Sequence, residues 1–210
     1  MDRFLKIFSR LLLTGLLLFE FLNYFRILNY NLDFTWLGLI ITGLYIWLIL
    51  ETTSFFLKKF CGKSMSGWVM IIATIAIYVD ALGDILHFYS QFGWWDRIAH
   101  LTGGGVAATG LIFYVVWNLC RCRKINIGLF GISFISLASA TLLGSMYEIE
   151  EYLEDYFTGS HRLGDGLDTA EDLMFNIVGG LVVLSIIVIY LKIKEKRSNT
   201  ALIKIKGNYK

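Results

Sequence analysis

Long apolar segments, each about the length needed to cross a lipid bilayer, recur along almost the whole sequence. A transmembrane helix needs roughly 20 predominantly apolar residues, and only short polar stretches separate these segments. We expect about six spans, at residues 7–27, 34–56, 67–89, 95–119, 125–148 and 168–191. The sequence therefore predicts an all-α fold, a polytopic helical bundle in a membrane, with a single membrane domain over residues 1–191.

The amino-acid composition supports a membrane protein. The chain is 56% hydrophobic and 17% charged, whereas an average soluble domain is about 25% charged. A chain of 210 residues with so few polar side chains cannot cover a water-soluble surface of its size. The same figures exclude a disordered chain, a collagen-like chain and a disulfide-rich scaffold.

The first apolar segment follows three basic residues and is interrupted by Glu20. A secretory signal peptide also begins with a basic region, but it ends at a cleavage site with small residues, and no such site follows this segment. We therefore expect an uncleaved first span.

Lysine and arginine are distributed unequally between the two ends of the expected spans. Sixteen of the 19 lie in the N-terminal segment, residues 57–66, residues 120–125 and the tail. Short cytoplasmic loops are enriched in these residues. We therefore expect both termini in the cytoplasm, a multi-pass protein of the inner (cytoplasmic) membrane, and a basic cytoplasmic tail at 192–210. Cys61, Cys120 and Cys122 would then be reduced.

Acidic residues are distributed the opposite way, and they follow a helical spacing. Twelve of the 17 lie between Asp80 and Asp172, in the outer half of the expected bundle. Residues three, four or seven positions apart share one face of a helix. Four helices thus present polar stripes, which we expect to converge on one outward-facing cavity. The stripes are Asp80, Asp84 and His87; Asp96 and His100; Glu148 and Glu151; and Asp168, Asp172 and Asn176.

The negative charge of so many carboxylates in one pocket has to be neutralised. An ionised carboxylate near the bilayer centre costs at least ~2.5 kcal/mol unless it faces protein or water. Arg97 is the only fixed cation expected nearby, so either several carboxylates are protonated or a cation is bound. Protonation would suit a proton-coupled transporter, and a cation would suit a site for Zn, Mn, Fe or Mg with oxygen and imidazole ligands. A network of hydrogen bonds between helices is a third interpretation.

The metal hypothesis assigns a role to each stripe. Glu148 or Glu151 would be the general base that activates a metal-bound water. Asp80 is the deepest carboxylate, and Asn176 extends the last stripe. The predicted metal ligands are Asp84, His87, Asp96, His100, Asp168 and Asp172. Such a protein would be a hydrolase or transferase that acts on a lipid or lipid-linked envelope substrate, with membrane lipids and no nucleic acid as partners.

Three motifs, in this order along residues 66–185, resemble those of YjdF-like bacterial inner-membrane proteins. They are Trp95-Asp-Arg-Ile-Ala-His100, Tyr147-Glu-Ile-Glu-Glu-Tyr152, and Asp168-Thr-Ala-Glu-Asp-Leu-Met-Phe-Asn176 followed by Gly179-Gly180. The Asp-x-x-x-Asn-x-x-Gly pattern that starts at Asp172 is also similar, more distantly, to the VanZ-like family, which is linked to glycopeptide tolerance. The resemblance implies a multi-pass membrane protein without assigning a reaction. A non-enzymatic membrane protein of the envelope-stress response is therefore a further alternative.

Overall fold

The structure is a computed structural model that describes the backbone of residues 1–207 and the side chains of residues 1–198. All regular elements in residues 1–207 are helices, which confirms the predicted all-α class. They are α1 (Asp2–Tyr24), α2 (Trp36–Cys61), α3 (Gly67–Ile85), α4 (Phe88–Gln91), α5 (Trp95–His100), the π-helix η1 (Leu101–Ala107), α6 (Ala108–Cys122), α7 (Leu129–Thr158) and α8 (Gly166–Gly207).

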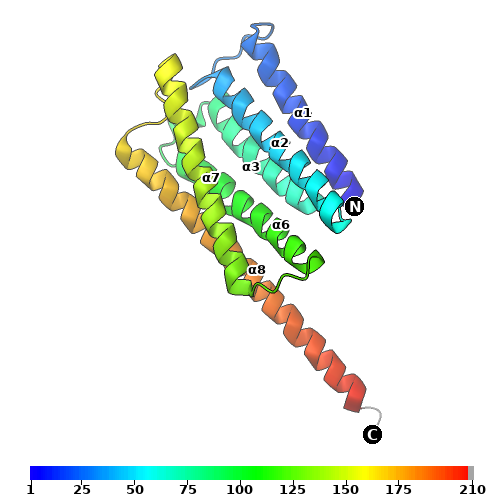
Figure 1. Ribbon diagram of the computed structural model, residues 1–210. Helices are drawn as coiled ribbons and strands as arrows, with labels where there is room; N and C mark the ends of the chain where they lie inside the picture. Colours follow the sequence, from blue (N-terminus) through cyan, green and yellow to red (C-terminus); the bar gives the residue numbers. More distant parts are fainter. Residues whose placement is uncertain (208–210) are drawn as a thin grey trace.

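Five stretches of the described chain are long and apolar enough to cross a membrane. They are α2, α3, the continuous stretch from α5 through η1 to α6, α7, and α8 as far as Ser198. The first expected span, α1, is not among them; it carries Lys6, Arg10 and Glu20 within its apolar sequence. It still packs lengthwise against α2 and α3, so it is part of the same bundle (Figure 1).

The helices form two groups that meet along one face. The first group contains α1, α2 and α3, and the second contains η1, α6, α7 and α8 (Figure 1). Helix α2 packs against α6, and α3 packs against η1 and α6. This seam between the two groups holds the cavity described below.

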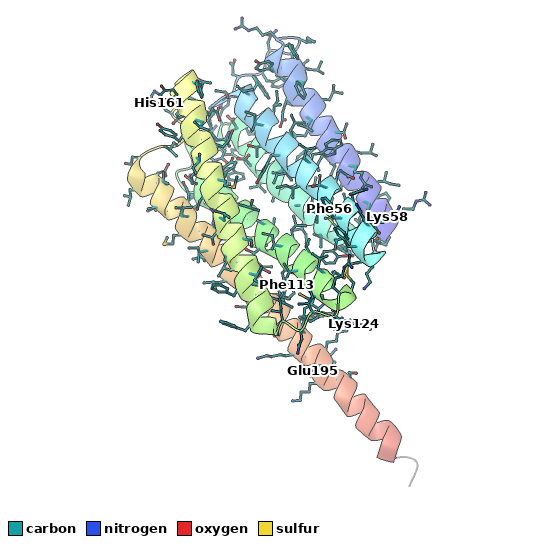
Figure 2. The ribbon with its side chains drawn as sticks, in the orientation of Figure 1. Phe56, Lys58, Phe113, Lys124, His161 and Glu195 are labelled. Carbon is teal, nitrogen blue, oxygen red and sulfur yellow. A yellow bond between two sulfur atoms is a disulfide. The ribbon has the colours of Figure 1, made fainter. Side chains whose placement is uncertain are left out.

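The charged ends of the bundle are arranged as the distribution of basic residues predicts. Figure 2 shows Lys58 and Lys124 at one end and His161 at the other. The N-terminus lies at the lysine end, because the backbone N–H of Gly67 donates to Asp2 Oδ1 (2.6 Å). The N-terminus and the α2–α3 connection therefore lie together. That this end faces the cytoplasm stays a prediction.

A disulfide joins the last residues of α2 and α6, where the sequence predicted reduced thiols. It links Cys61 to Cys122, whose Cα atoms are 5.4 Å apart, a separation within the usual range for a disulfide. Cys120 is free and buried. The pairing was not predictable because the two residues are 61 positions apart, and only the packing of α2 against α6 brings them together.

Helix α8 continues beyond the bundle. The sequence predicts a span that ends near residue 191 and a basic tail at 192–210, and the helix continues through this tail to Gly207 (Figure 1). Residues 208–210 of the expected tail lie outside the described residues.

Glycines allow α8 to lie directly against η1. A Cβ atom on Gly105 would be 2.7 Å from Gly179 Cα, and a Cβ atom on Gly179 would collide with the backbone oxygen of Leu101. Small residues serve such close helix packing in membranes. The contact brings the polar face of α8 beside His100. This residue lies directly before the π-helix η1, and π-helical turns are often found at functional sites.

Candidate functional site

His100 lies at the centre of a buried cluster drawn from three helices. Its Nε2 atom is 3.5 Å from Asp96 Oδ1 and 3.8 Å from Asp172 Oδ1, while its Nδ1 atom is 3.8 Å from Glu148 Oε1. These distances are longer than ordinary hydrogen bonds, which span about 2.7–3.2 Å. One ligand atom each from Asp96, His100 and Asp172 lies within 4.8 Å of the others, so these three residues could hold a metal ion.

Several polar atoms around His100 are buried without a hydrogen-bond partner. They include both carboxylate oxygens of Glu148, Oδ1 of Asp172 and both amide atoms of Asn176. The exposed fractions of these three residues are 5%, 2% and 2%. Buried polar groups in native proteins almost always have a partner. A bound ion, water molecules or protonation of the carboxyl groups would satisfy these atoms.

A second polar cluster surrounds the guanidinium of Arg162, which comes from the connection between α7 and α8. Its Nε donates to Glu151 Oε1 (2.9 Å), and its Nη atoms lie 3.5 Å from Asp80 Oδ1 and 3.6 Å from Glu154 Oε2. It also donates to the Tyr147 hydroxyl. Burial opposes its charge, but the surrounding tyrosine and carboxylates raise the pKa of Arg162 well above its usual value.

This arrangement corrects the prediction that Arg97 is the nearby cation. Arg97 instead pairs with Glu171 at the surface, with its Nε 2.7 Å from Oε2. Arg162 reaches the interior because its loop folds back onto α7. Asp155 accepts the backbone N–H groups of Arg162 (2.7 Å) and Leu163 (3.0 Å), which fixes the loop.

Two of the predicted metal ligands, Asp84 and His87, do not join the His100 cluster. Asp84 Oδ1 accepts the backbone N–H groups of Asp33 (2.7 Å) and Phe34 (3.0 Å), so it holds the connection between α1 and α2. His87 Nδ1 lies 2.7 Å from Asp33 Oδ1. Helix α3 ends at Ile85 and His87 has a φ of 59°, so the seven-residue spacing does not continue on a helix.

The remaining predicted residues lie in three places. Asp168 is half-buried, one turn before Asp172 and outside the triad. Glu148 faces the ring nitrogen of His100 opposite the triad carboxylates. Glu151 and Asp80, predicted as a base and as the deepest carboxylate, contact Arg162.

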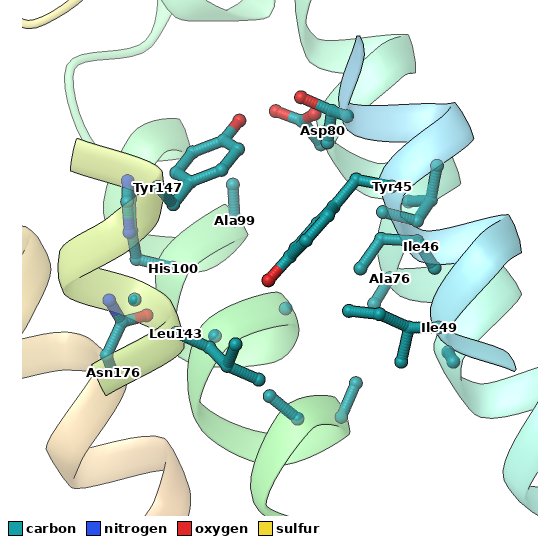
Figure 3. A pocket seen from close by; sticks show the side chains of 18 of the residues that line it. Tyr45, Ile46, Ile49, Ala76, Asp80, Ala99, His100, Leu143, Tyr147 and Asn176 are labelled. Atoms are coloured by element: carbon teal, nitrogen blue, oxygen red, sulfur yellow. The ribbon is translucent and has the colours of Figure 1, made fainter. Parts of the chain in front are cut away.

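A cavity of about 250 Å³ lies beside both clusters. Its polar end includes Asp80, Asp96, His100, Tyr147 and Glu151. The rest of its wall is mostly aliphatic and comes from α2, α3 and α6. Figure 3 shows Tyr45, Ile46 and Ile49 on one side and Tyr147, His100 and Asn176 on the other.

A comparison with models of known protein families gives a match. Residues 8–193 match the model of the family described as predicted membrane protein (DUF2238). The chain belongs to this family. No curated protein and no solved structure matches the chain. The match agrees with several membrane spans, and it leaves the resemblances to YjdF-like and VanZ-like proteins unconfirmed.

In this DUF2238 chain, the sequence did not reveal Arg162, Tyr147 or Tyr45 as parts of the site. One feature of the sequence could have singled out Arg162: it is the only lysine or arginine between Lys124 and Lys192. Tyr147 precedes Glu148 within a quoted motif but carries no charge. Tyr45 lies in an apolar span without a polar stripe, so nothing in the sequence separated it from residues that face lipid.

Proposed function

We propose that this protein is a metal-dependent membrane hydrolase or transferase that acts on a lipid or lipid-linked envelope substrate. The observation that carries the proposal is the convergence of Asp96, His100 and Asp172 from two helices, within 4.8 Å of one another. The unpartnered buried oxygens of Asp172 and Glu148 support it. Without a bound cation, the ionised carboxylates around His100 would repel one another in this buried place.

The donor set suits a divalent ion. One imidazole with two or three carboxylates matches Zn, Mn, Fe or Mg. The ion would lie on the Nε2 side of His100, toward Asp96 and Asp172. Glu148 would then face Nδ1, the position from which a carboxylate orients a metal-bound imidazole. This geometry supports a positioning role for Glu148 in place of the predicted role as general base.

An ion at this place would polarise an ester oxygen, or lower the pKa of a bound water. The aliphatic wall of the cavity supports a substrate with a lipid chain. It also supports an enzyme over a transporter, because the ionisable residues that line the cavity gather at one end. A proton path through this cavity would need such residues along its whole length.

Metal analysis tests the proposal. Tag-free protein, purified in mild detergent, is expected to retain about one equivalent of a transition metal per chain, or to be stabilised against heat by added Mg²⁺ or Mn²⁺. Less than about a tenth of an equivalent of any such metal, together with no thermal shift by any of the four ions, would contradict the proposal.

A further inference from the structure

We propose that the cavity binds a single alkyl chain of an amphiphile with an uncharged head group, which enters from the bilayer between α2 and α7. The assignment of this amphiphile as the substrate rests on the proposed function, whereas the binding of the chain does not. Three features carry the proposal: where the cavity is closed, what lines it, and which charges lie at its polar end.

The cavity is closed at the end nearest the α7–α8 connection. The Thr35 hydroxyl donates to Glu154, and the carboxylate of Glu154 also lies against Gly38, so the start of α2 contacts the end of α7. Arg162 lies beside this contact, with its Nη1 atom 3.6 Å from Glu154 Oε2. From there α2 and α7 diverge toward the lysine end of the bundle (Figure 1).

The cavity is partly open, and Tyr45, which lines it, is 39% exposed. The open side of the cavity therefore lies at the surface of α2. This surface belongs to a stretch that is apolar enough to span a membrane. A lipid chain can therefore enter sideways without crossing a polar loop.

The wall beyond the polar end suits a hydrocarbon. It is formed by Ile46 and Ile49 of α2, Ala76 of α3, and Ile112 and Val115 of α6. A polar ligand would leave its hydrogen bonds unmade along this wall, whereas an alkyl chain that leaves the bilayer exchanges one apolar environment for another and loses none. The volume of about 250 Å³ is slightly below the range of about 300–1,000 Å³ that is usual for ligand pockets. It suits one chain better than two.

The polar end disfavours an anionic head group. Asp80, Asp96 and Glu151 line it, and the guanidinium of Arg162 beside it is already engaged by Asp80 and Glu151. The charge of a divalent ion at the triad would likewise be balanced by Asp96 and Asp172. Like charges brought together in a cavity with low-dielectric walls repel strongly. The Tyr45 hydroxyl points into the cavity, away from Asp80 and toward the side of Leu143 and His100 (Figure 3). There it can donate a hydrogen bond to an uncharged ester oxygen.

Photolabelling of the full chain in lipid nanodiscs tests the proposal. Two probes carry the same diazirine-bearing alkyl chain, one as a glycerol ester and one as a phosphate. We expect the glycerol ester to label residues 45–53 and 111–115, at least about tenfold more strongly than the phosphate does. Ala76→Phe and Ala108→Phe fill the cavity from different helices and should each reduce this labelling at least about tenfold. Ile75→Phe, on the exposed face of α3, should leave it unchanged.

Metal content is measured on the same samples, so that the two proposals can fail separately. Labelling of the cavity in protein without metal would contradict the proposed enzyme and support chain binding. Labelling confined to lipid-facing residues, or labelling that both filled variants retain, would overturn the inference. Equal or stronger labelling by the phosphate probe would overturn its head-group part.

Discussion

Substitution of His100 by alanine is expected to abolish ion binding. His100 supplies the only imidazole of the triad, and its Nε2 atom lies between Asp96 and Asp172. Loss of an outer-shell partner alone typically weakens metal binding about 10- to 100-fold, so loss of the ligand itself should weaken it by more. Elemental analysis of the purified variant should find less than about a tenth of an equivalent of the metal that the wild-type protein retains.

The matched control is His87→Ala. His87 was also predicted as a ligand, but it pairs with Asp33 in a connection outside the triad, so its loss should leave the metal content unchanged. Asp172→Asn offers a second variant with nearly unchanged shape, and it should lower metal affinity while the protein stays folded. Equal metal content in the His100 and His87 variants would contradict the assigned centre.

Replacement of Arg162 by methionine should produce the largest loss of stability. The Arg162 side chain is 3% exposed and is shared by Asp80, Glu151 and Glu154. Removing one partner of a buried ion pair typically costs about 3–5 kcal/mol, because the remaining charges stay buried without compensation. We expect the melting temperature in detergent to fall by roughly 10 °C.

Arg97→Met is the matched control for this loss. Arg97 also pairs with a carboxylate, but its side chain is 44% exposed, and such surface pairs contribute about 0–1 kcal/mol. A second substitution, Glu151→Gln, should recover part of the stability in the Arg162 variant, since it removes one of the uncompensated charges. Similar small shifts for both arginine variants would show that Arg162 does not hold the cluster together.

The sequence predicted best which residues share a face of the same helix. Asp96 and His100 are four residues apart on one helical segment, and Asp172 and Asn176 repeat that spacing on α8, so their shared faces followed from periodicity alone. The glycines at 105 and 179 then allowed the two segments to pack closely, as small residues in membrane helices do. The shared faces could be predicted without the structure, whereas the pairing of these two glycines could not.

The errors arose where the chain leaves a helix or where distant segments meet. Periodicity extended to His87, but α3 ends two residues earlier and His87 turns toward Asp33. Arg162 belongs to the connection between α7 and α8, and nothing in its sequence shows that Asp155 folds this loop back. The Cys61–Cys122 pair depends on the contact between α2 and α6. None of these three features can be read from residues that are close together in the sequence.

The most direct test of the metal centre is X-ray absorption spectroscopy at the edge of the ion bound to tag-free protein. The structure predicts a coordination shell of oxygen and nitrogen at about 2.0–2.2 Å, with the scattering pattern of one imidazole, and its loss in His100→Ala. A shell with sulfur, with two or more imidazoles, or with no imidazole would show that Asp96, His100 and Asp172 do not hold the ion.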